Sequence, residues 1–136
     1  MRKLASITLF VLLSFSSFAQ GNSAGKTDID LKLSKLEWTG KKLGGEHYGE
    51  IQMASGYLMF AKNKLTGGTF VMDMASITCA DITDEKSNRR LVDHLKSEDF
   101  FSVDRFPTSK FVIAKVDPKS TNEYTVTGNL TIKEKT

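Results

Sequence analysis

Cysteine and proline are nearly absent from this chain of 136 residues. Its one cysteine, Cys79, cannot form a disulfide within the chain, so the fold has to be held by its apolar core. Two prolines and ten glycines are too few for a collagen-like or low-complexity protein. Apolar side chains make up 40% of the residues and aromatic ones 10%, which is enough for one packed domain.

A large charge of one sign is missing as well. The formal charge is +3, from 19 basic and 16 acidic residues, and Arg2 and Lys3 supply two of the basic ones. Without these two, 17 basic residues stand against 16 acidic ones, an excess of +1. That excess is too small for a nucleic-acid-binding surface, so we expect no nucleic-acid partner.

Arg2 and Lys3 belong to an N-terminal pattern that is typical of a secretory signal. The basic start is followed by an apolar run from Leu4 to Phe18 and then by the small residue Ala19. Because the run is shorter than the roughly twenty apolar residues of a membrane-spanning helix, we expect no stable membrane anchor. We therefore predict a signal peptide at 1–19, a flexible leader at 20–27 and one domain at 28–136. A protein with such a signal is expected to be periplasmic or secreted.

Alternating polarity dominates the chain from Asp28 onward and is typical of β-strands. A slip of the alternation near Ser34 indicates a bulge, and Ala54 to Gly56 is interpreted as a hairpin turn. One face of the last strand is apolar and the other polar, as in antiparallel sandwiches and barrels. The predicted strands lie near 29–38, 47–53, 57–62, 69–77, 108–116 and 124–133, with turns at 40–45, 63–68 and 117–122.

The alternation stops between residues 83 and 97. Leu91 and Leu95 stand at helical spacing there, and Asp84 is available as an N-cap. The sequence therefore predicts one short amphipathic helix, followed by a loop that ends at Pro107. With six strands and one helix, the predicted fold class is mainly all-β.

Groups that could carry catalysis are few. The chain has two histidines, His47 and His94, and lacks the spacings of a metal site, a phosphate loop or a serine nucleophile. A hydrolase or redox enzyme using Cys79 with His47 or His94 stays open, because such partners meet in space. Cys79 equally suits a small buried hydrophobe, His94 a packing role on the helix, and His47 a locked turn or a cavity mouth. We expect no catalytic residue, no metal and no cofactor.

Flexible apolar side chains, by contrast, are plentiful. There are nine phenylalanines and five methionines, and such side chains fill irregular space. They suit a compact core and equally the wall of a pocket for a long hydrocarbon. The interior of an eight-stranded barrel is either filled by side chains or holds one small ligand, and the alternation does not decide between the two. A surface interaction module without a ligand cavity is a third alternative.

Six segments of the chain form a recognisable set. They are LEWTG at 36–40, GEHYG at 45–49, FVMDMASI at 70–77, LVDHLKSEDFF at 91–101, FPTSKF at 106–111 and VTGNLTIK at 126–133. The most specific are the predicted helix with the double Phe that follows it and the Phe-Pro-Thr-x-x-Phe segment. In these segments the chain resembles the YceI-like family of exported lipid-binding proteins, and the resemblance covers nearly all of the chain from Asp28 to Lys133.

This resemblance implies a lipocalin-like antiparallel β-barrel with one short helical insertion and an elongated cavity. It further implies binding of a long-chain isoprenoid or other amphiphilic lipid, for transport or storage rather than catalysis. Burial of the hydrocarbon would contribute roughly 0.8 kcal/mol per CH₂ group. A homodimer is left open.

Strand parity, and not the family, points to the residues expected to line the cavity. Seven lie in the strands between 47 and 77, and three aromatic residues lie in the loop expected near an entrance. These candidates are Ile51, Met53, Leu58, Phe60, Phe70, Met72 and Met74, with Phe100, Phe101 and Phe106 at the entrance.

The C-terminal end departs from the family pattern. Members usually continue Leu-Thr-Ile-Lys with Gly, whereas Glu134 follows Lys133 in this chain. A lipocalin-like barrel needs eight strands and six are predicted. We therefore expect the final strands to be missing from this sequence.

Overall fold

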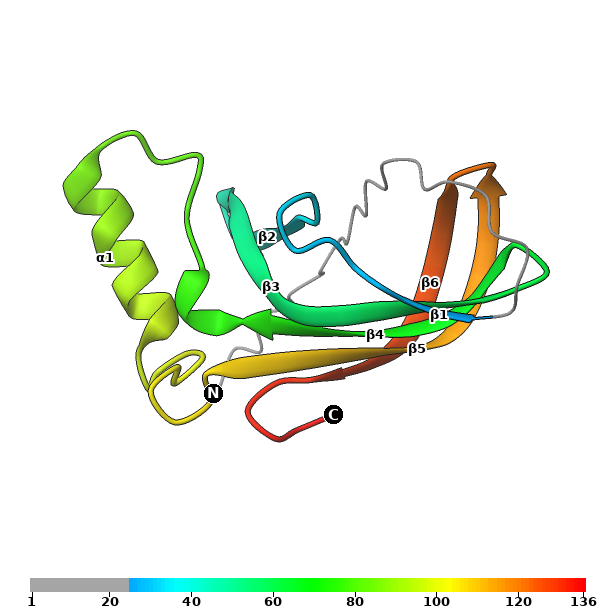
Figure 1. Cartoon of the computed structure of the whole chain (residues 1–136). Coiled ribbons are helices and arrows are strands. Elements are labelled where there is room, and N and C mark those ends of the chain that lie inside the picture. Colours follow the sequence, from blue (N-terminus) through cyan, green and yellow to red (C-terminus); the bar gives the residue numbers. More distant parts are fainter. Residues whose placement is uncertain (1–24) are drawn as a thin grey trace.

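The computed structural model describes residues 25–136 (Figure 1). The predicted signal peptide at 1–19 and residues 20–24 of the predicted leader lie outside the described residues. Strands dominate, which confirms the predicted all-β class. The elements are β1 (Gly25–Asp28), β2 (Leu36–Lys42), β3 (Gly45–Ala61), β4 (Lys64–Asp73), the 3-10 turn η1 (Met74–Ser76), α1 (Glu85–Lys96), β5 (Thr108–Ser120) and β6 (Glu123–Thr131).

The strands pair in antiparallel fashion in the order β1-β3-β4-β5-β6, and β2 pairs with the N-terminal part of β3. Figure 1 shows the sheet curling upward at both ends, through the start of β3 at one end and through β5 and β6 at the other. Within residues 25–136 no pairing joins β6 to β1 or β2. The described sheet is therefore open, where a closed barrel was expected, because six strands with this curvature do not bring their two edges together.

β3 is a single bent strand of 17 residues, where two strands and a turn were predicted. Register shifts between Met53 and Ser55, and between Met59 and Phe60, mark β-bulges. The first part of β3 pairs with β2, and the second part pairs with β1 and β4. The predicted turn at residues 54–56 was wrong, because pairing of Ser55 and Gly56 with β4 and a hydrogen bond from the Ile29 amide to the Gly56 carbonyl at 3.0 Å hold this backbone extended.

The first predicted strand was also placed wrongly. Residues 31–33 form a turn, in which the amides of Lys32 and Leu33 donate to the Asp30 carboxylate at 2.8 and 3.3 Å. Leu31 and Leu33 are exposed as a result. An Asp side chain offers such local bonds to the backbone, and here they outweigh the alternation. Residues 25–27, expected within the leader, belong to β1.

Other boundaries moved because the turns are tighter than predicted. Lys62 and Asn63 alone connect β3 to β4, with φ angles of 49° and 60° that suit a two-residue hairpin. A similar short turn joins β5 to β6, so β5 runs on through Pro118. β4 ends at Asp73, where η1 begins to lead the chain toward α1.

α1 confirms the predicted helix. The Asp84 carboxylate caps it by accepting a hydrogen bond from the Ser87 amide at 2.8 Å. Leu95 is buried, and Leu91 packs against the core beside it. The helix stands at one end of the sheet, as Figure 1 shows, so the molecule has a helical end and a β5–β6 end.

Candidate functional site

One face of the sheet, which we call the inner face, carries the apolar core. The cross-strand register defines it: Met53 lies opposite Met72, and Phe70, Phe111 and Leu130 form a row across β4, β5 and β6. Phe70 and Met72 are each only 3% exposed. The alternation that predicted these residues on one face was therefore correct for this part of the sheet.

Most of the predicted cavity-wall residues lie in this core. Phe60 is partly buried and packs against the others. The structure thus brings all seven together, and their contact with a ligand stays a prediction. The buried ones are Ile51, Met53, Leu58, Phe70, Met72 and Met74.

The three aromatic residues predicted at an entrance lie in the loop between α1 and β5. Phe100 and Phe101 stack edge to face with ring centroids 4.8 Å apart and pack against the core. Phe106 is half-buried, with the Arg105 guanidinium 5.3 Å from its ring centroid. The Lys133 ammonium donates to the Phe100 carbonyl at 3.0 Å, which ties this loop to the end of the chain.

The inner face continues beyond the predicted residues onto β5 and β6. The side chains there are apolar but only half-buried, although they pack against the core. The sequence signal for them was available, because β6 has the clearest alternation in the chain. The inner-face residues that were not among the predicted cavity-wall residues are Phe111, Val116, Tyr124, Val126 and Leu130.

A strap of residues 76–82 runs beside the start of β3 at the helical end. The Thr78 and Ala80 amides donate to β3 carbonyls at 2.9 and 2.8 Å. The Trp38 indole donates to the Thr78 carbonyl at 2.9 Å. Gly49 permits this approach, because a Cβ at that position would clash with the same carbonyl. The strap therefore takes the place of a further strand along this edge of β3.

Asp81 fastens the strap, and it is the residue that joins the candidate catalytic groups. Its carboxylate bonds to His47 Nδ1 at 2.8 Å and accepts from the Tyr48 amide at 3.0 Å and from the Cys79 thiol at 3.3 Å. The hydrogen bond with His47, followed by that from Tyr48, holds the pKa of Asp81 far below its usual range. Such a carboxylate remains charged and acts as a fixed acceptor.

The same cluster bears on the enzyme alternative. Burial raises the pKa of the Cys79 thiol, so the thiol form dominates at neutral pH. Cys79 and His47 bond to different oxygens of Asp81, so a carboxylate and not an imidazole receives the thiol hydrogen bond. His94 lies on α1 against Phe100, with ring centroids 6.2 Å apart. A cysteine nucleophile needs a base that accepts its proton. Asp81 is a poor base because its pKa is so low, so the hydrogen bond from Cys79 is suited to a structural tie.

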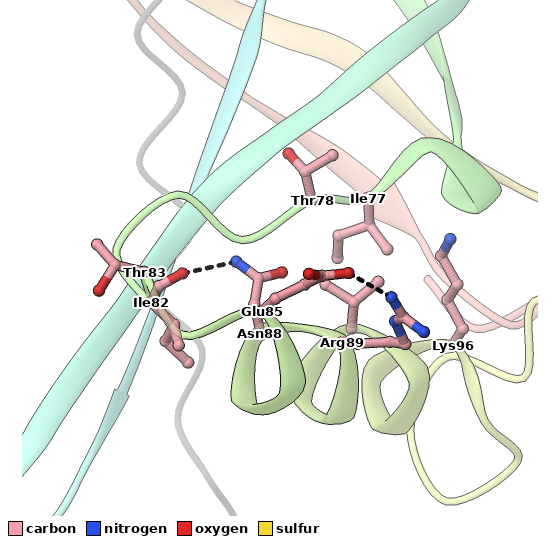
Figure 2. Close-up of a pocket in the computed structure, with 9 residues that line it drawn as sticks. Ile77, Thr78, Ile82, Thr83, Glu85, Asn88, Arg89 and Lys96 are labelled. Atoms are coloured by element: carbon pink, nitrogen blue, oxygen red, sulfur yellow. Dashed lines mark hydrogen bonds and ion pairs between the residues drawn. The ribbon is translucent and has the colours of Figure 1, made fainter.

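A cleft separates α1 from the strap, as Figure 2 shows. The Asn88 amide holds the two together by donating to the Cys79 and Ile82 carbonyls, both at 2.9 Å. Beside this contact lies a volume of about 520 Å³. It is lined by Ile77, Thr78, Ile82 and Thr83 from the strap side and by Glu85, Asn88, Arg89, Val92 and Lys96 from α1.

Comparison with known protein families identifies the chain. The model of the YceI-like domain matches residues 28–136. The chain belongs to the YceI-like family. At the family level this supports a lipid-binding or polyisoprenoid-binding protein, which is a binding function rather than an enzymatic one. No curated protein matches the chain.

Two further observations apply to the described part of this YceI-like chain. Within residues 25–136 no helix is long and apolar enough to cross a membrane. Over the same residues no group of three or more His, Cys, Asp or Glu side chains is placed to hold a metal ion.

Proposed function

We propose that this YceI-like protein is an exported carrier that holds the hydrocarbon part of a long-chain isoprenoid or other amphiphilic lipid against its inner face. The observation that carries the proposal is the apolar surface of β5 and β6 that the fold leaves half-covered. Leu130 continues the row of Phe70 and Phe111, and Tyr124 and Val126 pack against the same core from farther along β6, yet all three remain partly exposed. A hydrocarbon chain placed there would remove from water both its own surface and the exposed part of these side chains.

The chemistry of the site supports storage or transport. The inner face offers methionine and aromatic side chains, which adapt to a flexible tail without fixing one position of it. We also propose a periplasmic or secreted location, on the strength of the N-terminal signal pattern. A nearly balanced charge favours lipid over nucleic acid as the partner.

A pair of neighbouring residues on β6 tests the proposal. Val126 lies on the inner face, and Thr127 is exposed on the other. We expect Val126→Asp to abolish lipid recovery on organic extraction of the purified protein, because a carboxylate on the inner face opposes hydrocarbon binding. Thr127→Asp adds the same charge to the same strand, and it should keep the wild-type lipid content.

The result depends on both variants being folded, which circular dichroism checks. If Val126→Asp fails to fold, Val126→Thr keeps nearly the same shape and should lower the lipid content. Equal lipid content in Val126→Thr and Thr127→Asp, or a wild-type protein without lipid, would contradict the proposal.

A further inference from the structure

The cleft between α1 and the strap has an apolar floor that belongs to the core. Ile77 is 2% exposed and is a member of the core cluster. Val92 packs against the same cluster from the helix side, and Ile82 is half-buried at the other end of the cleft. A short hydrocarbon segment lying in this cleft would therefore contact the apolar interior of the molecule, not its polar surface.

The rim of the cleft is basic on balance. Arg89 and Lys96 both line it, and they are seven residues apart on α1, so they lie two turns apart on one side of the helix. Glu85 bonds to Arg89 at 2.6 Å. Lys96 forms no ion pair within residues 25–136, although it is only partly exposed. Figure 2 shows the Lys96 side chain reaching from the helix toward the strap side of the cleft.

We propose that this cleft recognises the anionic head of an amphiphile, a carboxylate or a phosphate, with Lys96 as its principal contact. The first hydrocarbon segment would then lie on Ile77 and Val92. An ammonium group without an acidic partner, beside apolar surface, is suited to an anion that is attached to hydrocarbon. This inference rests on the proposed function, since it takes the ligand to be an amphiphile, and it adds the chemical class of the head group.

The chain contains its own reporter for the cleft. Trp38 is the one tryptophan, and its indole is bonded to the carbonyl of Thr78, which lines the cleft. Occupation of the cleft should change the emission of Trp38. The probes are decanoate, decyl phosphate and 1-decanol, which share one tail and differ in the head. Binding constants are measured by calorimetry, with Trp38 emission as the readout specific to the cleft.

Substitutions on α1 isolate the charge. We expect Lys96→Ala to weaken decanoate or decyl phosphate binding about tenfold, the loss typical of one charge-assisted hydrogen bond, and to leave 1-decanol binding unchanged. Lys86→Ala removes the same charge from an exposed position on the same helix that does not line the cleft. It should bind all three probes as the wild type does. If Lys96→Ala is poorly folded, Lys96→Met keeps the aliphatic stem and makes the same test.

The outcomes separate this inference from the proposed function. The stronger of the two anionic probes identifies the head as carboxylate or phosphate. Equal binding of decanoate, decyl phosphate and 1-decanol, or equal losses in Lys96→Ala and Lys86→Ala, would overturn the anionic head while leaving a lipid carrier intact. The anionic head would also be overturned if the protein binds a long isoprenoid alcohol while decanoate and decyl phosphate leave the Trp38 emission unchanged. If no probe binds and the purified protein contains no lipid, both proposals fail.

Discussion

The two ends of the sheet differ in hydrogen bonding and in how completely their apolar side chains are covered. At the helical end, hydrogen bonds accepted by the Asp81 carboxylate and donated by the Asn88 amide and the Trp38 indole fasten the strap to β3, α1 and β2. Ile77, Cys79 and Leu95 are buried there. At the β5–β6 end, the inner face is equally apolar, but its side chains are only half-covered. The comparison suggests a division of tasks. The helical end stabilises the fold and offers the cleft in which we place the head group, and the β5–β6 end supplies the apolar surface on which we place the rest of the lipid tail.

The largest effect should come from truncating two aromatic side chains of the inner face, one that is buried and one that is half-covered. Phe70 and Phe111 face each other across β4 and β5, but Phe70 is buried and Phe111 only partly so. We expect Phe70→Ala to lower the free energy of unfolding by about 3–5 kcal/mol, because it leaves a cavity in packed surroundings. Phe111→Ala should cost clearly less. Urea unfolding of the lipid-free variants measures both, and equal losses would contradict the distinction between the buried core on β4 and the half-covered surface that begins on β5.

An intermediate effect is expected from the Asp81 tie, and it should depend on pH. The pKa of Asp81 is lowered in the folded protein, so its stabilising contribution is complete above the usual pKa of an Asp, about 4, and is lost as the pH falls below that value. Asp81→Asn should therefore lower the Tm at pH 6, and the gap between wild type and variant should narrow toward pH 3.

The matched control for this change is Asp117→Asn. Asp117 forms a surface ion pair with Lys115 at 2.9 Å, outside the strap, and such pairs contribute little to stability. Thermal unfolding followed by circular dichroism compares the two variants. A Tm gap for Asp81→Asn that stays constant from pH 6 to pH 3 would argue against the charged tie.

The smallest effect concerns the start of α1. Asp84→Ala removes the N-cap and leaves the Ser87 amide without that acceptor. We expect a loss of a few degrees in Tm. Asp84→Ser should recover most of it, because serine also caps helices well. If Asp84→Ala and Asp84→Ser melt at the same temperature, the cap does not help to anchor the helical end.

The elements that the sequence predicted correctly are those with local causes. α1 followed from Leu91, Leu95 and the Asp84 cap, and β6 followed from its unbroken alternation. Both signals lie within about a dozen residues. The inner-face parity of β4 was predictable for the same reason, since Phe70 and Met72 repeat with the period of a strand.

What the sequence could not show depends on contacts between distant residues. The small residues at 54–56 are typical of a turn, and only their pairing with the distant strand β4 makes them part of one bent strand. Asp81 meets His47 across 34 positions, and Trp38 meets Thr78 across 40. No local pattern marks such pairs. Arg89 and Lys96 likewise stand out only once the strap lies opposite α1.

The central claim, that the inner face holds the hydrocarbon of an amphiphile, is tested most directly by native mass spectrometry of the wild-type protein purified without detergent from exporting cells. We expect a bound species that extracts into organic solvent and carries a long hydrocarbon tail, and we expect this species to be lost in Val126→Asp but not in Thr127→Asp. A folded wild-type protein that carries no such species, and that takes up no isoprenoid or fatty amphiphile when one is added, would contradict it.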